Sequence, residues 1–196
     1  YGYTKADLGI VMTILSVAYG VSKFVMGNAS DRSNPKYFST VGLLLSALVM
    51  LLFGTLPGVM SSIPIMCVLA FLNGWFQGMG WPPSGRVLVH WYSVSERGGK
   101  TAIWNVAHNV GGGLMAPIAL LGISITGTLS FGYLKGFEGA FIYPAIIALI
   151  IALVSYILVR DTPQSMGLPP IEEYRNDYPN KEQKSLEVEL STKDIL

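Results

Sequence analysis

Two titratable side chains lie inside long apolar runs of this sequence, where a charged group is costly unless it has a partner or a role. Lys23 follows Tyr19 by four residues, so on a helix their ammonium and phenol hydroxyl share one face. Such a pair suits the oxygens of a phosphate ester, although the Lys23 side chain could instead extend to the membrane surface. His108 is the second titratable residue, and Asn105 precedes it by three residues on the same face. His108 could contribute to an anion site or simply bridge neighbouring helices.

Gln77 and Trp81 form a third candidate pair, four residues apart on what would be one helix face. Gly74 and Gly78 flank this face with the Gly-x-x-x-Gly spacing that lets membrane helices pack closely. Helix packing and the lining of a pathway are equally compatible with this pattern. Positions at the membrane interface or in helix packing are expected for the other tryptophans, Trp75, Trp91 and Trp104.

The sequence has none of the patterns typical of metal or nucleotide chemistry. Its His, Cys, Asp and Glu residues do not cluster at metal-ligand spacing, and a single cysteine, Cys67, cannot form an internal disulfide. A Walker loop, a nucleophile elbow and a dinucleotide fingerprint are all missing from the sequence. We therefore expect no metal, no cofactor and no nucleic-acid partner, and we do not expect an enzyme.

The elements that must hold these residues are membrane helices. Hydrophobic residues make up 51% of the 196 residues and charged residues only 13%, whereas soluble domains carry about a quarter charged residues. Uncharged runs cover residues 37–85, 101–134 and 139–159. Each run is long enough for a membrane span, which needs about 20 apolar residues. The composition therefore predicts an all-α membrane protein.

Five transmembrane helices are expected, and short signals mark where several of them begin or end. Thr4 and Asp7 have the spacing of a capping box at the start of the first helix. Pro57 and Gly58 should end the second helix, and Pro82-Pro83 should kink the third and free backbone carbonyls. The predicted spans are residues 6–27, 36–56, 64–91, 99–125 and 137–159.

Basic residues are concentrated at one end of the predicted bundle, which indicates that this end faces the cytoplasm. The opposite end has only Lys5 and Lys135. This orientation puts residue 1 outside the membrane, so we expect that at least one helix precedes it in the complete protein. The basic end, as we call it below, contains Arg32, Lys36, Arg86, Arg97, Lys100 and Arg160.

The character of the chain changes after residue 160. Four prolines and alternating charges follow, a composition typical of a linker outside the membrane. We therefore divide the chain into transmembrane helices (1–160) and a cytoplasmic linker (161–196). The last six residues, 191–196, could begin another helix.

Several sequence motifs carry a resemblance to a known family. Gly27 and Asp31-Arg32, followed by Lys36, are similar to the loop signature of the major facilitator superfamily. There, glycine lets two helices approach closely, and Asp31 could cap the next helix or pair with a basic residue across the turn. Longer strings resemble the organophosphate:phosphate antiporter family within that superfamily: Gly74-Trp-Phe-Gln-Gly-Met-Gly-Trp-Pro-Pro83, Glu96-Arg97-Gly-Gly, Trp104-Asn-Val-Ala-His108-Asn, and Arg160-Asp-Thr-Pro-Gln-Ser-Met-Gly.

The resemblance implies a fold and an activity. The chain would supply the second to sixth helices and the following linker of a twelve-helix transporter, whose two halves rock around a site at the membrane midplane. The activity would be exchange of glycerol 3-phosphate for inorganic phosphate across the bacterial inner membrane. The partners would be these two solutes, the lipid bilayer and the missing C-terminal half. In the family the face of Lys23 and Tyr19 lines the pathway, His108 matches a histidine of the phosphate site, and Asn105 matches its polar neighbour. Gln77 and Trp81 would line the same visible half of the site.

Two other functions stay open on the sequence alone. A membrane sensor of organophosphates would use the same fold to signal rather than to transport. A membrane enzyme acting on glycerolipids would need a nucleophile and base, or a metal cluster, near the interface. His90 offers no such pair, because Ser95 rather than an acidic residue stands five positions later. The two arginines that the family needs for phosphate lie on its first and seventh helices, outside this sequence.

Overall fold

The structure, a computed structural model, describes residues 2–129, 134 and 136–177, and this part of the chain contains helices and no strand. Five helical segments are long and apolar enough to cross a membrane, so the predicted all-α class and the predicted five spans are confirmed. Lys135 and the helix predicted to begin at residues 191–196 lie outside the described residues. The spans are Lys5–Asp31, Pro35–Thr55, Ile63–Trp91, Val94–Leu129 and Gly139–Leu158.

The first two helices begin at side-chain caps. Helix α1 (Lys5–Asp31) starts with the predicted capping box, in which the Thr4 hydroxyl accepts from the Asp7 amide and the Asp7 carboxylate accepts from the Thr4 amide. Helix α2 (Pro35–Thr55) is capped by Asn34, whose side-chain oxygen accepts from the first-turn amides. The suggestion that Asp31 caps α2 is therefore wrong: Asp31 is still part of α1, and its side chain is exposed.

The third span is broken, but not where the prolines stand. Helix α3 (Ile63–Gln77) ends before a turn at Gly78–Gly80, and helix α4 (Trp81–Trp91) then continues in the same span. Pro82 and Pro83 lie in the first turn of α4, where a missing amide hydrogen costs no intrahelical bond. The predicted interruption of this span is confirmed. Its predicted position at Pro82-Pro83 is wrong, because the turn is formed by Gly78–Gly80.

Two long helices complete the membrane part. Helix α5 (Val94–Leu129) starts five residues before the predicted span, and helix α6 (Gly139–Leu158) agrees with its predicted span to within two residues. The rest of the described chain contains three short helices. They are η1 (Val59–Ser61), η2 (Gln164–Met166) and α7 (Ile171–Arg175), the last two within the predicted linker.

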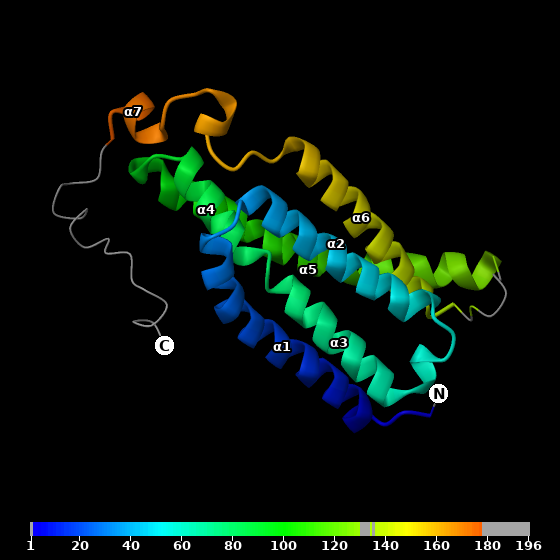
Figure 1. Cartoon of the computed structure of the whole chain (residues 1–196). Coiled ribbons are helices and arrows are strands. Elements are labelled where there is room, and N and C mark those ends of the chain that lie inside the picture. Colours follow the sequence, from blue (N-terminus) through cyan, green and yellow to red (C-terminus); the bar gives the residue numbers. More distant parts are fainter. Residues whose placement is uncertain (1, 130–133, 135, 178–196) are drawn as a thin grey trace.

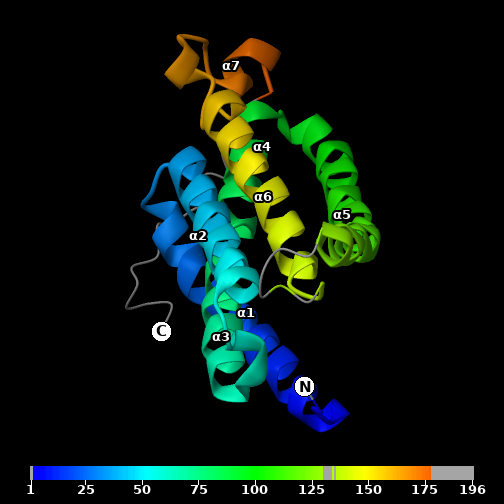
Figure 2. The same cartoon turned by 90° about the vertical axis from the view of Figure 1, so that its right-hand side faces the viewer.

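The helices pack in pairs, with α1 along α3, α2 along α6 and α5 along α6 (Figures 1 and 2). Small residues make the α1–α3 contact close, because a Cβ added at Gly74 would collide with the Leu15 carbonyl and one at Gly78 with the Ser22 side chain. The packing role predicted for these two glycines is confirmed. The same prediction for Gly27 is wrong within the described residues, where a Cβ at Gly27 would meet open space.

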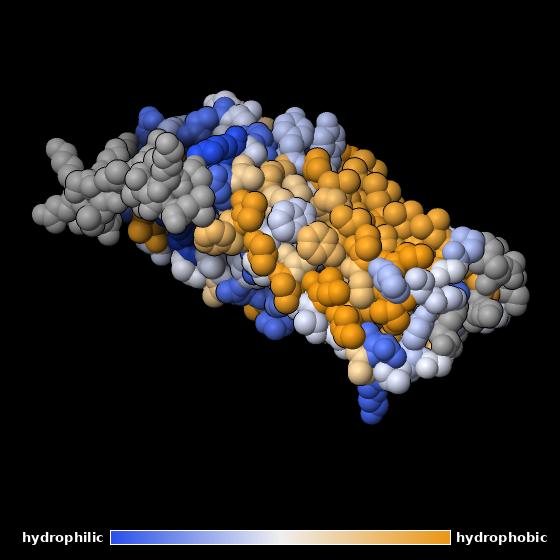
Figure 3. Space-filling model, turned by 60° about the horizontal axis from the view of Figure 1, so that its bottom comes forward, coloured by the Kyte–Doolittle hydropathy of each residue, from blue (hydrophilic) through white to orange (hydrophobic). Residues whose placement is uncertain are grey.

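The buried core is small and lies between α2 and α3, while most large apolar side chains point outward. Figure 3 shows the result on one face, a band of hydrophobic surface between polar ends. An apolar exterior of this extent is stable against lipid but not against water. The core residues are Val49, Phe53, Val59, Met66, Leu69 and Ala70.

Arginines at the basic end hold helix ends together through backbone carbonyls. The Arg86 guanidinium donates to the carbonyls of Ser30 and Ser33 (2.8 Å to Ser33), so α4 is tied to the turn between α1 and α2. Arg97 donates to the Val89 carbonyl at 3.1 Å, near the end of α4. These bonds use carbonyls that helix ends leave without an intrahelical partner.

The described part of the predicted linker folds back onto the basic end. The Trp91 indole donates to the Arg160 carbonyl (3.0 Å), and the Asn34 amide donates to the Asp161 carboxylate (2.7 Å). Burial opposes ionisation of Asp161, but hydrogen bonds from Ser165, the backbone and Asn34 outweigh it and lower the pKa of this carboxyl. The junction between α6 and the linker is thus attached to the end of α4 and to the cap of α2.

A second attachment joins the end of α7 to the start of α5. Arg175 forms an ion pair with Glu96 at 2.8 Å. The Asp177 carboxylate accepts from the amide (3.2 Å) and the hydroxyl (3.1 Å) of Ser95. These hydrogen bonds, the amide first, lower the pKa of Asp177. A carboxylate in this position also complements the positive end of the α5 dipole.

Candidate functional site

Lys23 projects from α1 toward the break between α3 and α4. Its Nζ lies 4.9 Å from the ring centroid of Tyr19 and 4.6 Å from that of Trp81. Both distances are within the range of a cation–π contact. Lys23 is half-buried, and within the described part of the chain no carboxylate forms an ion pair with it. The ammonium is therefore held by rings that leave its charge uncompensated.

Trp81 connects this lysine to α5. Its ring centroid lies 4.4 Å from that of Trp104, edge to face, and 6.1 Å from that of His108. A cavity of about 240 Å³ opens beside these rings and is lined by Gly80, Trp81, Trp104, Ala107 and His108. Four of the six predicted site residues are thus brought together from α1, α4 and α5: Lys23 and His108 lie beside the Trp81 indole, and Tyr19 contacts Lys23.

The helix break explains why Trp81 can take this position. Helix α3 ends at Gln77 and Trp81 is the first residue of α4, so Trp81 does not continue the α3 helix. The following prolines fix the backbone of the first turn, because their rings lock one backbone dihedral. The Trp81 indole therefore projects from the rigid first turn of α4, directly after the turn at Gly78–Gly80.

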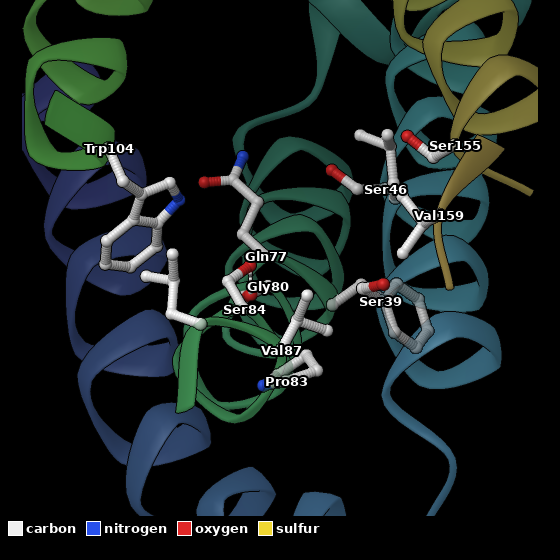
Figure 4. Close-up of a pocket in the computed structure, with 13 residues that line it drawn as sticks. Ser39, Ser46, Gln77, Gly80, Pro83, Ser84, Val87, Trp104, Ser155 and Val159 are labelled. Carbon is white, nitrogen blue, oxygen red and sulfur yellow. Dashed lines mark hydrogen bonds between the residues drawn. The ribbon is translucent and has the colours of Figure 1, made fainter. Parts of the chain in front are cut away.

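Gln77 lies on the other side of the break, in a different cavity. This cavity, of about 420 Å³, is shared by α2, α3, α4, α5 and α6. Figure 4 shows the Gln77 amide between Trp104 and Ser46. The predicted common face of Gln77 and Trp81 is wrong, because the turn at Gly78–Gly80 interrupts the helical register between them. The two cavities meet at Gly80 and Trp104, which line both.

Asn105 does not join the cluster as directly as its neighbour His108. It lies on α5, three residues before His108, and its side chain is exposed. It is not among the residues that line the cavity beside His108. Open space surrounds Gly112, one turn after His108, so this face of α5 is accessible.

Sequence reasoning placed Trp104 among packing or interface residues and missed several serines. Trp104 does pack, but its partner is Trp81 and it borders both cavities. The signal was present, because Trp104 precedes His108 by four residues and so shares its face. The serines carried no signal, since hydroxyls in membrane helices commonly bond to their own helix backbone. Those that line the larger cavity are Ser39, Ser46, Ser84 and Ser155.

The arrangement suits an anion better than a metal. A lysine ammonium, a phenol and an imidazole all donate hydrogen bonds, and the indole rings exclude water on one side. Within the described ranges no group of three or more His, Cys, Asp or Glu is placed to hold a metal ion. The chemistry available is therefore binding of an anionic group, with aromatic walls around it.

The chain belongs to the major facilitator superfamily, whose family model matches residues 1–192. It is accordingly a multi-pass protein of the bacterial inner membrane, built from part of that fold.

Individual relatives give a narrower comparison. The chain is 56% identical to the glycerol-3-phosphate transporter of Bacillus subtilis over its whole length and covers 42% of that relative. It is 49% identical to the glycerol-3-phosphate transporter of Haemophilus influenzae, over 98% of the chain and 41% of the relative. It is also 39% identical to the membrane sensor protein UhpC of Salmonella typhimurium, over 98% of the chain and 41% of the relative. The chain thus spans about two-fifths of the length of the curated relatives it matches.

Proposed function

We propose that the complete protein exchanges glycerol 3-phosphate for inorganic phosphate across the membrane. The observation that carries this proposal is the half-buried Lys23 ammonium, held by the Tyr19 and Trp81 rings without a carboxylate partner among the described residues. A positive charge inside an apolar span is costly unless an anion compensates it. A phosphate ester, which carries between one and two negative charges near neutral pH, would provide that compensation.

His108 would supply a second donor to the same phosphate. It reaches the cluster from α5, whereas Lys23 reaches it from α1, so a bound phosphate would link two helices through the Trp81 indole. Gln77 and Asn105 lie nearby on α3 and α5 and would contact the glycerol part or the path to the site. Inorganic phosphate fits the same donors, which is the chemical basis of exchange.

The transport cycle would be alternating access. Two halves of the complete protein would rock around the site, and this chain would supply part of the first half, with residues 161–196 as the cytoplasmic linker. The contacts of Arg175 with Glu96 and of Asp177 with Ser95 attach the described linker residues to the start of α5, so this part would move as one body. Transport rather than catalysis is proposed because the chain belongs to the major facilitator superfamily and matches relatives named as transporters.

A membrane sensor is the second candidate, supported by the 39% identity to UhpC. Sensing and transport would use the same anion site, since both begin with binding of an organophosphate. They differ in whether the bound solute crosses the membrane. Net movement of solute therefore distinguishes the two functions.

The test is counterflow in vesicles that contain the full-length protein. Vesicles loaded with phosphate should take up labelled glycerol 3-phosphate, and Lys23→Gln should weaken the apparent affinity at least tenfold by removing the charge that compensates phosphate. Lys5→Gln is the matched control, because it removes a charge from the exposed start of the same helix. Binding without uptake would favour the sensor. Unchanged affinity in Lys23→Gln would overturn the proposed site.

A further inference from the structure

A groove on the outer surface of α2 and α6 has the features of a lipid site. It encloses about 320 Å³ and begins at the basic end, where the first turn of α2 lies beside the last turn of α6. Both helices run side by side in the two views (Figures 1 and 2). Apart from one threonine and two tyrosines the lining is aliphatic: Tyr37, Thr40, Val41, Leu44, Leu149, Ala152, Leu153 and Tyr156.

The groove is apolar along its length and open to the surroundings. Val41 and Leu44 are 44% and 40% exposed on α2, and Leu153 is 61% exposed on α6. From Tyr37 to Leu44 the groove descends seven residues of helix, or about 10 Å at 1.5 Å per residue. A hydrocarbon chain lying there would replace an apolar gap with contacts on two helices.

A cation stands at the mouth of this groove. The Lys36 Nζ lies 4.8 Å from the ring centroid of Tyr156 and 5.5 Å from that of Tyr37, so the two rings position it. The ring centroids themselves are 6.0 Å apart. Lys36 is half-buried, and among the described residues it has no carboxylate partner. The nearby acid, Asp161, bonds instead to the amide of Asn34.

We propose that this groove binds an anionic phospholipid, with its phosphate at the Lys36 ammonium and one acyl chain between α2 and α6. Tyrosines and lysine at the level of the headgroups, above an apolar channel, match the two parts of a lipid molecule. The positive end of the α2 dipole lies at the same place and favours the negative headgroup. This inference is independent of the proposed transport function, because the groove lies apart from the Lys23–Trp81 cluster.

The loop signature does not account for these features. It calls for a basic residue after Asp31-Arg32, but not for a lysine between two tyrosines from different helices. A lysine that only extended to water would need neither the two tyrosine rings nor the apolar groove beneath them. The combination of charge, rings and channel therefore specifies the ligand class.

The experiment uses the full-length protein in nanodiscs and native mass spectrometry of the lipids it retains. The probes are phosphatidylglycerol and phosphatidylcholine with identical acyl chains. Wild type should retain phosphatidylglycerol about fivefold better, which corresponds to the roughly 1 kcal/mol that one lysine contributes beside an anionic surface. Lys36→Gln should abolish this preference. Lys100→Gln should preserve it, because Lys100 also lies over a single tyrosine ring at the basic end, 5.2 Å from Tyr92, but away from the groove.

A second pair of variants tests the acyl channel. Val41→Trp should fill the groove and reduce retention of both lipids several-fold, whereas Leu48→Trp, at an exposed position on α2 outside the lining, should not. Both sites face outward, so neither change strains the core. An equal phosphatidylglycerol preference in wild type and Lys36→Gln would overturn the proposal. The proposal would also be overturned if a second copy of the protein, and not lipid, occupied the groove and were displaced by Val41→Trp.

Discussion

Removal of the Trp81 ring should disrupt the proposed anion site from its centre. In Trp81→Leu the Lys23 ammonium loses a ring at 4.6 Å and Trp104 loses an edge-to-face partner at 4.4 Å. A half-buried cation–π contact contributes about 1 kcal/mol, and an aromatic pair contributes about 0.5–1.5 kcal/mol. Without these contacts the Lys23 ammonium and the Trp104 ring are no longer held in place, so a phosphate ester would lose part of its binding free energy in ordering them. We expect its affinity to fall by roughly 5- to 30-fold, which corresponds to about 1–2 kcal/mol.

The assay is equilibrium binding of labelled phosphate to the full-length protein in detergent, with glycerol 3-phosphate as competitor. Trp81→Phe keeps a ring face under Lys23 and should recover about half of the lost free energy. Trp75→Leu is the control, because Trp75 stacks on Phe71 at 5.8 Å and lies outside the cluster. The reasoning is refuted if Trp81→Leu binds within twofold of wild type, or if Trp75→Leu weakens binding equally.

Three further predictions concern stability. Gly78→Val should force a side chain into α1 and cost about 1–3 kcal/mol, seen as a lower melting temperature, whereas Gly111→Val, in open space, should not. Arg86→Gln should lower the melting temperature more than Lys100→Gln does, because it removes both hydrogen bonds that tie α4 to the end of α1 and the following turn; equal midpoints would contradict this. The Asp177 contact with the start of α5 should be complete above the ordinary carboxyl pKa of 3.8 and be lost as pH falls through the lowered pKa. Asp177→Ala should therefore speed hydrogen exchange at the Ser95 amide at neutral pH, and unchanged exchange would refute the contact.

The five spans were predictable from composition because a bilayer imposes one requirement on every crossing helix: about 20 predominantly apolar residues. The capping box at Thr4 was predictable for a similar reason, since both of its bonds form between residues three apart. Spacing alone did not decide which side chain caps α2. Asp31 and Asn34 are both good caps, and which one acts depends on where α1 stops.

The position of the break in the third span could not be predicted from the proline pair alone. Proline is compatible with a first helical turn as well as with a kink, so the sequence allowed a break on either side of it. The break lies at the earlier position, where Gly78 packs closely against Ser22 of α1. As a consequence Gln77 and Trp81, four residues apart, line different cavities.

The sequence by itself determined the membrane class, the number of spans and the pairing of Tyr19 with Lys23, because each depends on composition or on spacing within one helix. Only the tertiary structure decided that Trp81 lies between Lys23 and His108, since these residues come from three helices. The same holds for Lys36, whose ring partner Tyr156 is far away along the chain. Contacts between helices depend on how their faces pack, and that packing is selected by small residues and helix ends distributed over the whole chain.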